Sequence, residues 1–564
     1  MTHLFATLNG TLPMKKQFHS AFGLTLVLQL AATAAYGFQP TEEGPIAHWP
    51  LAKEASDAAG GEFHGKPRGV QFATADGHSF AQFDGRESVI EVPHSPKWRL
   101  GKGDFSVALW LHTDEKLTDD LGELISQYDA KQRRGFSLSL RNNCVTSSQA
   151  NYRQLQFGID NGTQPKWTDL GRPGNSLYGM SMCVHDGRLY SGTCEPATDQ
   201  AGHVYRYEGG TSWVDLGFPD KSNAVVCMAV YRGKLHVGTG KYRLGGSALA
   251  ESENANLGGR IFRLDDGDRW TLVGHLPGVE ATASLVVFRD TLYASSLYRP
   301  AGFYRYEGEQ NWTALETPGG KRPESLAVYN GYLWATGYDE GHIYRFDGQN
   351  WKDMGALGEN TQTYSFAVER GRLYVGTWPS GKVYRLSPQD EWQDTGRLGE
   401  ELEVMGMLLH NGKLYAGTLP LAEMFRYDGD QQWNSVGRLD LTPDVKYRRI
   451  WSCAQYQGRL VATTLPSGHV HALEAGKCVT FDHPLPPGWR HVTAVRGGER
   501  LRLYVDGKQV AESTPLRPAD FDLSTEQPLL IGGGPGDYLS GRLRNVRLYH
   551  RALDKAEIHK LATE

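Results

Sequence analysis

The sequence predicts an all-β protein in which a seven-bladed β-propeller is inserted into a jelly-roll sandwich. Three observations predict this architecture. A leucine-centred phrase recurs seven times at a period of about 40 residues, tryptophan strands accompany it, and segments of alternating polarity flank the repeats on both sides. Glycine accounts for 67 of 564 residues, which suits many short strands joined by tight turns.

Each repeat contains four strand-like segments. An apolar segment comes first, then a leucine phrase such as Leu373-Tyr-Val-Gly-Thr, then an aromatic and arginine phrase such as Val383-Tyr-Arg-Leu. A turn, often Asp-Gly or Glu-Gly, and a tryptophan strand complete most repeats. Four strands at this period are the content of one propeller blade. The leucine phrases begin at Leu189, Leu235, Leu292, Leu333, Leu373, Leu414 and Leu460.

The tryptophan strands indicate how the ring closes. One of them, at Trp167, precedes the first leucine phrase, and none follows the last phrase. We therefore expect Trp167 to complete the seventh blade, which would leave few free strand edges. The propeller is predicted to span residues 165–478.

The flanking segments, residues 44–163 and 484–564, alternate apolar and polar residues as half-buried strands do. Neither segment has enough strands to bury two sheet faces alone. We expect the two segments to form one sandwich together, interrupted by the propeller.

The C-terminal phrases carry a family resemblance. Leu501-Arg-Leu-Tyr-Val-Asp-Gly-Lys, and the stretch from Gly541 to the Arg-Ala-Leu at Arg551, resemble laminin G-like domains of the concanavalin A-like lectin superfamily. The propeller repeats are similar to kelch-like repeats. The resemblance implies a secreted sandwich that often binds glycans, in some members with calcium. Family members usually carry Asp-Glu where this chain has Arg544-Asn545, and this difference argues against a calcium site there. We expect no cofactor, and a calcium ion is implied by the family resemblance alone.

Composition and the N-terminus bear on location and partners. Lysine and arginine total 59 against 64 acidic residues, a balance that does not favour nucleic acid as a partner. Lys15 and Lys16, the apolar run from Phe22 to Ala35 and the small residues before Phe38 predict a signal peptide over residues 1–37. Translation starts at either Met1 or Met14. Cleavage would leave no membrane span, so we expect a secreted, periplasmic or cell-surface protein.

Five of the six cysteines fall into two groups. Cys183, Cys227 and Cys453 occupy repeat positions where other blades place small or apolar residues, so they are predicted to be core residues. Cys144 and Cys478 bracket the insertion, where a disulfide between them would join its two ends. Free thiols at both positions are the alternative.

Candidate ligand-binding residues are those that break the repeat without a packing reason. At the position nine residues before the leucine of each leucine phrase, most blades have Met, Val or Ala, but three blades have an acid or an aromatic residue. At the position five residues after that leucine, two blades have an aromatic residue, on loops at one face of the predicted propeller. Aromatic faces with a few charges are typical of sugar-binding surfaces. The candidates are Glu324, Tyr338, Asp339, Tyr364, Trp378, Arg448 and Trp451, and the loop from Gly240 to Gly259 is a candidate recognition loop.

The predicted function is a non-catalytic, secreted carbohydrate-binding or surface-interaction protein whose partner is a glycan, a polysaccharide or an extracellular protein. The first alternative is a glycoside hydrolase or lyase whose site is on the same propeller face. Its acids would come from Glu280, Glu324, Asp339 and Glu403. The second alternative is a scaffold that binds other proteins.

Overall fold

The computed structural model describes residues 44–564 except residue 198. The expected signal peptide, residues 1–37, lies outside the described residues. The described part of the chain is all-β apart from one short α-helix, α1 (Lys555–Leu561), and the 3-10 turns η1 (Pro96–Trp98), η2 (Leu244–Ser247), η3 (Pro318–Gly320) and η4 (Pro518–Asp520). No helix in this part is both long enough and apolar enough to cross a membrane.

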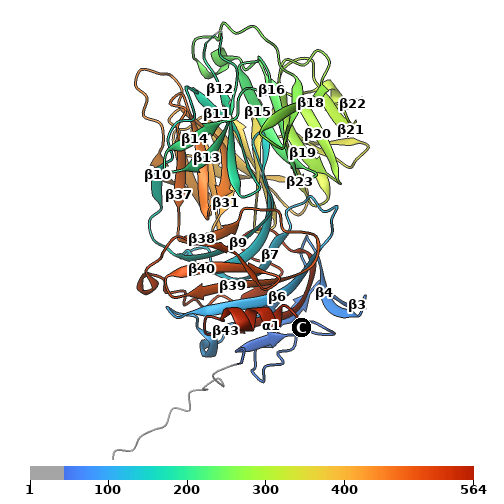
Figure 1. Cartoon of the computed structure of the whole chain (residues 1–564), viewed down its shortest axis with the longest axis vertical. Helices are drawn as coiled ribbons and strands as arrows, with labels where there is room; N and C mark the ends of the chain where they lie inside the picture. Colours follow the sequence, from blue (N-terminus) through green and yellow to red (C-terminus); the bar gives the residue numbers. More distant parts are fainter. Residues whose placement is uncertain (1–43, 198) are drawn as a thin grey trace, which may run out of the picture. The chain divides into compact units, whose positions relative to one another are not determined.

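Two flanking sheets contain strands from both ends of the chain. Strand β6 pairs with β39 and with β43, and Figure 1 shows these three strands side by side. In order, the first flanking sheet contains β3 (Gln71–Ala75), β4 (His78–Asp84), β43 (Ser540–Tyr549), β6 (Phe105–Thr113), β39 (Gly488–Gly497), β40 (Arg500–Val505) and β41 (Lys508–Glu512), with β1 (Ala47–Trp49) also on β43. The second contains β2 (Lys66–Arg68), β5 (Val89–Val92), β42 (Leu529–Ile531), β7 (Gly122–Asp129), β8 (Arg134–Val145), β9 (Ser148–Asn161) and β38 (Lys477–Phe481).

Apolar and polar side chains alternate along these strands, and the apolar ones form one core between the two flanking sheets. Phe105 of β6 is fully buried in the same cluster as Phe136 of β8 and Leu503 of β40. The rings of Phe105 and Phe136 lie 5.2 Å apart. Because the cluster draws on residues before and after the repeats, neither flank can bury its apolar face without the other.

Residues 166–474 form four-stranded antiparallel units, numbered 1 to 7 below, of which units 1 and 2 are joined into one eight-stranded sheet by a single pairing, Cys194 with Ala224. Units 1 to 3 are β11 (Tyr178–His185), β12 (Arg188–Cys194), β13 (Val204–Gly209), β14 (Ser212–Asp215); β15 (Ala224–Tyr231), β16 (Lys234–Gly240), β17 (Arg260–Asp265), β18 (Arg269–His275); and β19 (Thr282–Phe288), β20 (Thr291–Ser296), β21 (Phe303–Gly308), β22 (Asn311–Leu315). Units 4 and 5 are β23 (Pro323–Tyr329), β24 (Tyr332–Gly337), β25 (His342–Phe346), β26 (Trp351–Ala356); and β27 (Gln362–Glu369), β28 (Arg372–Trp378), β29 (Lys382–Leu386), β30 (Trp392–Arg397). Units 6 and 7 are β31 (Glu403–His410), β32 (Lys413–Leu419), β33 (Glu423–Gly429), β34 (Gln432–Arg438); and β35 (Arg449–Tyr456), β36 (Arg459–Leu465), β37 (Val470–Glu474), β10 (Lys166–Asp169).

The first strands of consecutive units contact one another, and β35 returns to contact β11. Strand β10, which carries Trp167, pairs with β37, so the prediction that the first tryptophan strand completes the last unit is confirmed. The repeated tryptophan also has a bonding role. Trp167 donates its indole N–H to the Val436 carbonyl of unit 6 at 2.8 Å, and Trp213 of unit 1 donates to Leu170 at 2.9 Å. Each tryptophan of the series therefore ties its unit to the one before.

The tip of the β8–β9 hairpin reaches into the repeat region from the second flanking sheet. The hairpin contacts the first strand of every unit, and β9 is visible as a long strand in Figure 1. Thr146 donates from its hydroxyl to the Trp451 carbonyl at 2.8 Å and accepts from the Gly406 N–H at 3.2 Å. Ser148 accepts from the Met228 N–H at 3.0 Å. These polar tip residues satisfy buried backbone groups in the middle of the repeats.

Candidate binding site

The repeat region has a cavity of about 380 Å³, which we call the repeat cavity. It opens at the end of the sheets where the first strand of each unit begins and the second strand of each unit ends. Glu403 and Arg449 are the first residues of β31 and β35, and Trp378 is the last residue of β28. Because neighbouring strands are antiparallel, these positions meet at one end of the sheets. The lining residues are Tyr242, Arg243, Gly246, Leu297, Tyr298, Arg322, Glu324, Tyr338, Gln362, Tyr364, Trp378, Glu403, Tyr447, Arg449 and Trp451.

A buried ion pair forms part of the cavity wall. The Arg449 guanidinium contacts the Glu403 carboxylate through Nε–Oε1 at 2.7 Å and Nη2–Oε2 at 3.1 Å. The side chains are only 6% and 2% exposed. Burial raises the pKa of Glu403, while Arg449 opposes that shift. The remaining Arg449 nitrogen, Nη1, donates to Ser247 at 3.0 Å and to the Tyr242 hydroxyl at 3.3 Å, which ties the loop after β16 to unit 7.

Two further arginines of the cavity are paired with carboxylates. Arg322 contacts Asp339 through Nη2–Oδ1 at 2.6 Å and Nε–Oδ2 at 3.0 Å. The hydrogen bonds from Arg322 lower the pKa of Asp339. Arg243 donates from Nη2 to both oxygens of Glu280, at 2.9 and 2.7 Å. The two-nitrogen pairing with Asp339 fixes the Arg322 guanidinium, and each carboxylate offsets the charge of the arginine that it contacts.

Glu324 differs from the other acids of the cavity. It is 3% exposed, and its Oε2 atom has no hydrogen-bond partner among the described residues. Burial raises the pKa of this carboxyl group to about 8, opposed by the charges of Arg322 and Arg449. An unpartnered carboxyl group facing a cavity can donate to or pair with a bound molecule.

Aromatic side chains surround these charged groups. Tyr298, Tyr338, Trp378 and Tyr447 are half-buried, so part of each ring stays accessible. Each of these four rings is held by a neighbour. Arg322 lies over the Tyr338 ring at 4.4 Å, Arg243 lies over the Tyr298 ring at 4.6 Å, and Trp378 meets Tyr447 edge to face at 6.4 Å. Rings fixed in this way offer apolar faces to a ligand at little entropic cost.

The structure brings most of the sequence-predicted residues together. The five that line the repeat cavity are Glu324, Tyr338, Tyr364, Trp378 and Trp451. Asp339 lies behind Arg322 as its ion-pair partner. Arg448 does not line the cavity, since its Nε donates to the Thr442 carbonyl at 2.6 Å. Its neighbour Arg449 takes that place, because successive side chains of a strand point to opposite faces.

Some lining residues were not among the predicted ones. Arg322 lies eleven positions before Leu333, and Tyr298 lies six positions after Leu292. Neither position has a consensus across the repeats, so the comparison that found the other candidates does not single out these two residues. The predicted recognition loop does contribute, through Tyr242, Arg243 and Gly246.

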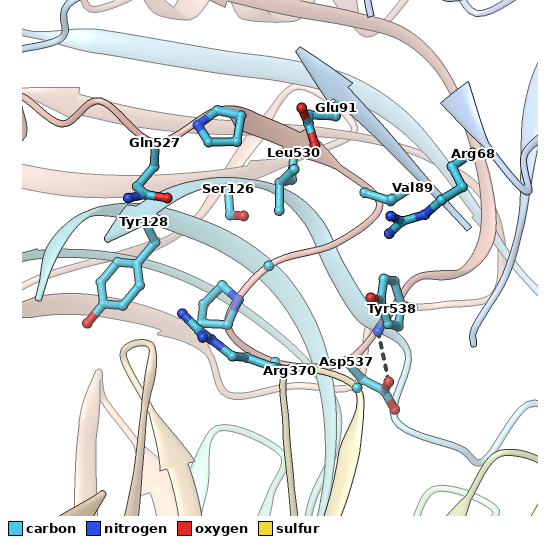
Figure 2. A pocket seen from close by; sticks show the side chains of 15 residues that line it. Arg68, Val89, Glu91, Ser126, Tyr128, Arg370, Gln527, Leu530, Asp537 and Tyr538 are labelled. Atoms are coloured by element: carbon cyan, nitrogen blue, oxygen red, sulfur yellow. Dashed lines mark hydrogen bonds between the residues drawn. The ribbon is translucent and has the colours of Figure 1, made fainter. Parts of the chain in front are cut away.

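A second cavity of about 280 Å³ lies beside the second flanking sheet (Figure 2). Figure 2 shows Ser126, Leu530 and Val89 on its wall and Arg370, from the turn after β27, at its edge. Backbone bonds from Arg370 and its neighbour Gly371 reach Pro535 and Gly536, at 2.9 and 2.7 Å, and join unit 5 to this sheet. The buried Ser126 hydroxyl already donates to Gly533 at 2.9 Å.

Of the two alternatives for Cys144 and Cys478, a disulfide or free thiols, the structure has free thiols at both positions. The register of β9 gives the reason. Cys144 lies opposite Gln149 and Cys478 lies opposite Gly158, nine positions along the same strand (158 minus 149). At about 3.3 Å per residue these positions are roughly 30 Å apart, whereas bridged cysteines need Cα atoms within about 7 Å. Cys183, Cys227 and Cys453 are fully buried, as predicted.

The calcium ion implied by the resemblance finds no suitable ligands at the position considered. Arg544 lies over the rings of Trp110, at 4.5 Å, and Trp489, at 5.2 Å, and so places a cation where family members usually have an acid. Across residues 44–564, apart from 198, no group of three or more His, Cys, Asp or Glu side chains is arranged to hold a metal ion.

Comparison with known families gives one match. The profile described as the concanavalin A-like lectin/glucanases superfamily matches residues 461–559, from β36 to α1. The C-terminal part of the chain is therefore similar to laminin G-like domains. No curated protein sequence matches the chain.

Three similar solved structures share a distant likeness with this chain. Virginiamycin B lyase from Staphylococcus aureus is 10% identical, with a TM-score of 0.44 over 55% of this chain and 99% of that chain. The extracellular domain of a proposed hybrid two-component system from B. thetaiotaomicron is 12% identical, with a TM-score of 0.41 over 61% of this chain and 46% of that chain. The WD40 β-propeller domain of Doa1 is 12% identical, with a TM-score of 0.39 over 55% and 97%. Likenesses this distant assign no function to this chain.

Proposed function

We propose that this chain is a non-catalytic carbohydrate-binding protein that acts outside the cytoplasm, and that the repeat cavity holds saccharide units. In this proposal units 1 to 7 are the blades of one seven-bladed propeller, residues 165–478. The propeller is inserted between the halves, 44–163 and 484–564, of a laminin G-like jelly roll, and residues 1–37 are removed on secretion. The laminin G-like part would provide a second surface for glycans or for extracellular proteins.

One observation carries the proposal. The repeat cavity combines accessible faces of Tyr338 and Trp378 with polar groups that are already fixed, above all the Arg449–Glu403 pair. A sugar ring has apolar C–H faces that stack on aromatic rings, and hydroxyl groups that exchange hydrogen bonds with carboxylates and guanidinium groups. A cavity of about 380 Å³ is of the size that suits small ligands.

The hydrolase or lyase alternative has one specific observation in its favour. Burial raises the pKa of Glu324 to about 8, so this acid is protonated at neutral pH, as a general acid must be. Glycoside hydrolysis ordinarily needs a second, available carboxylate. The other three candidates are each held by an arginine, namely Glu280 by Arg243, Asp339 by Arg322 and Glu403 by Arg449. Binding without turnover is therefore the better-supported function.

The test uses a panel of bacterial and algal polysaccharides with the full chain. Retention of the protein on some of them, with no new reducing or unsaturated ends, is the expected result. Trp378→Ala and Tyr338→Ala should each weaken retention at least about tenfold and leave the melting temperature nearly unchanged, because both rings are only half-buried. Phe218→Ala, at a ring 55% exposed and outside the cavity, is the matched control and should change neither.

Two results would count against the proposal. Retention that is unaffected by both aromatic variants would place binding elsewhere. Products that form with the wild-type protein and disappear with Glu324→Gln would make the chain an enzyme.

A further inference from the structure

The charges around the repeat cavity do not balance. Three arginines line it, and each is paired with one carboxylate: Arg243 with Glu280, Arg322 with Asp339 and Arg449 with Glu403. Glu324 is a fourth carboxyl group and has no arginine left to pair with. Arg299, 78% exposed, adds only a 4.0 Å contact to Asp339 and is not part of the lining.

The unpaired carboxyl group is buried and faces the cavity. Glu324 is the second residue of β23, is 3% exposed and lines the cavity, and its Oε2 atom is unpartnered. A buried carboxyl group without a partner is costly to keep, and ligand-binding sites are where such cost is retained. The bound molecule therefore has to supply the missing partner.

The rings near Glu324 indicate what kind of partner suits it. Burial is the main cause that raises the pKa of the Tyr298, Tyr338 and Tyr364 hydroxyl groups, and the nearby Glu324 carboxyl group adds to each shift. Tyr364 donates its hydroxyl to Gln362 Oε1, so that hydroxyl is not available to Glu324. Aromatic faces attract cations, and a carboxylate among them adds a full opposite charge.

We infer that the repeat cavity selects saccharides that carry a free amino group, with Glu324 as the carboxylate that pairs with the ammonium. This inference rests on the proposed carbohydrate-binding function and names its ligand class. Half-buried Tyr338 and Trp378 would stack on the sugar ring, while the three arginine–carboxylate pairs, already neutral, would face hydroxyl groups.

Binding has a definite proton balance. In the empty cavity at pH 6.5 the Glu324 carboxyl group holds a proton, because burial raises its pKa to about 8, with Glu403 and Asp339 adding to that shift and Arg322 and Arg449 opposing it. An incoming ammonium stabilises the carboxylate, so the carboxyl proton leaves to the solvent and an ion pair forms. One proton is therefore released for each amino sugar bound, and none for a neutral sugar.

The experiment titrates the full chain with three matched trisaccharides: the β-1,4-linked trimers of glucosamine, of N-acetylglucosamine and of glucose. Calorimetry at pH 6.5 in buffers of different ionisation enthalpy counts the protons. The glucosamine trimer should bind at least about tenfold more tightly than the other two and release about one proton. This count needs only the wild-type protein, so it does not depend on a variant that folds.

A variant pair assigns the effect to one residue. Glu324→Gln should weaken binding of the glucosamine trimer about 10- to 100-fold and abolish the proton release, because the amide cannot form an ion pair. Glu400→Gln changes an acid that is 94% exposed and outside the cavity, and should change neither quantity.

The outcomes separate the two proposals. If the protein binds polysaccharides of the panel but has no preference for the glucosamine trimer, or releases no proton, this inference is refuted and carbohydrate binding stands. If it binds neither the panel nor any trimer, both proposals fail.

Discussion

Removing one partner of the Arg449–Glu403 pair should strongly destabilise the protein. The two side chains are 6% and 2% exposed and make two contacts, at 2.7 and 3.1 Å. In Glu403→Gln the guanidinium remains buried without a carboxylate, and in Arg449→Met the carboxylate remains without a guanidinium. Each uncompensated buried charge costs about 3–5 kcal/mol in the free energy of unfolding.

The double variant distinguishes a charge effect from a packing effect. Glu403→Gln with Arg449→Met leaves no unpaired charge, so its cost should be well below the sum of the two single costs, with a coupling of about 2 kcal/mol or more. The matched control is the exposed pair of Arg397 and Glu400, 41% and 94% exposed and 3.9 Å apart. Exposed pairs contribute about 0–1 kcal/mol.

Urea unfolding followed by tryptophan fluorescence measures all of these variants on one scale. Single-variant costs below about 1 kcal/mol, or costs that simply add in the double variant, would refute the reasoning, because they would show that water reaches the pair.

Three further predictions concern the hairpin, the unpaired acid and the thiols. Thr146→Val removes the hydroxyl that bonds to Trp451 and Gly406, so it should lower the free energy of unfolding by about 2–3 kcal/mol in a urea titration; a loss under about 0.5 kcal/mol would show that the tip is not needed. Burial raises the folded-state pKa of Glu324 to about 8, so this carboxyl group lowers stability progressively as pH rises from about 4.5 to 8. Glu324→Gln should therefore gain about 3–5 kcal/mol relative to wild type over that interval, and a pH-independent difference would contradict this. All six cysteines are free, so Ellman's reagent without reductant should detect six thiols after denaturation. Before denaturation it should react slowly, because the thiols are buried and burial raises the pKa of Cys144 to about 12. Fewer than six thiols after denaturation would indicate a disulfide.

Much of the candidate site could be predicted by comparing the repeats. Equivalent residues of different units occupy equivalent places, so a departure at one position identifies residues at one end of the sheets. Glu324, Tyr364 and Trp451 share such a position, and all three line the repeat cavity. Trp167 was predicted to complete unit 7 for a similar reason. The last repeat of the series has no tryptophan strand of its own, so the extra tryptophan strand before the first repeat has to supply it.

Other features leave no such signal. Gln149 and Asn151 in the hairpin tip are polar, yet both are fully buried. Polar residues between two strand patterns normally predict an exposed loop. Only the tertiary structure shows that Asn151 bonds to the buried backbone of Gln455, whereas the Gln149 amide has no partner among the described residues. Cys144 and Cys478 bracket the insertion in sequence, but sequence distance carries no information on their separation along β9. The partners of the arginines are likewise set by side-chain geometry that the repeat pattern does not contain.

The most direct test of the account is a crystal structure of the chain with a bound oligosaccharide from whichever polysaccharide retains it most tightly. We predict electron density for a sugar ring in the repeat cavity, stacked on Trp378 or Tyr338 and within hydrogen-bond distance of Glu324. A sugar bound only at the flanking sheets, with the repeat cavity empty, would contradict the central claim.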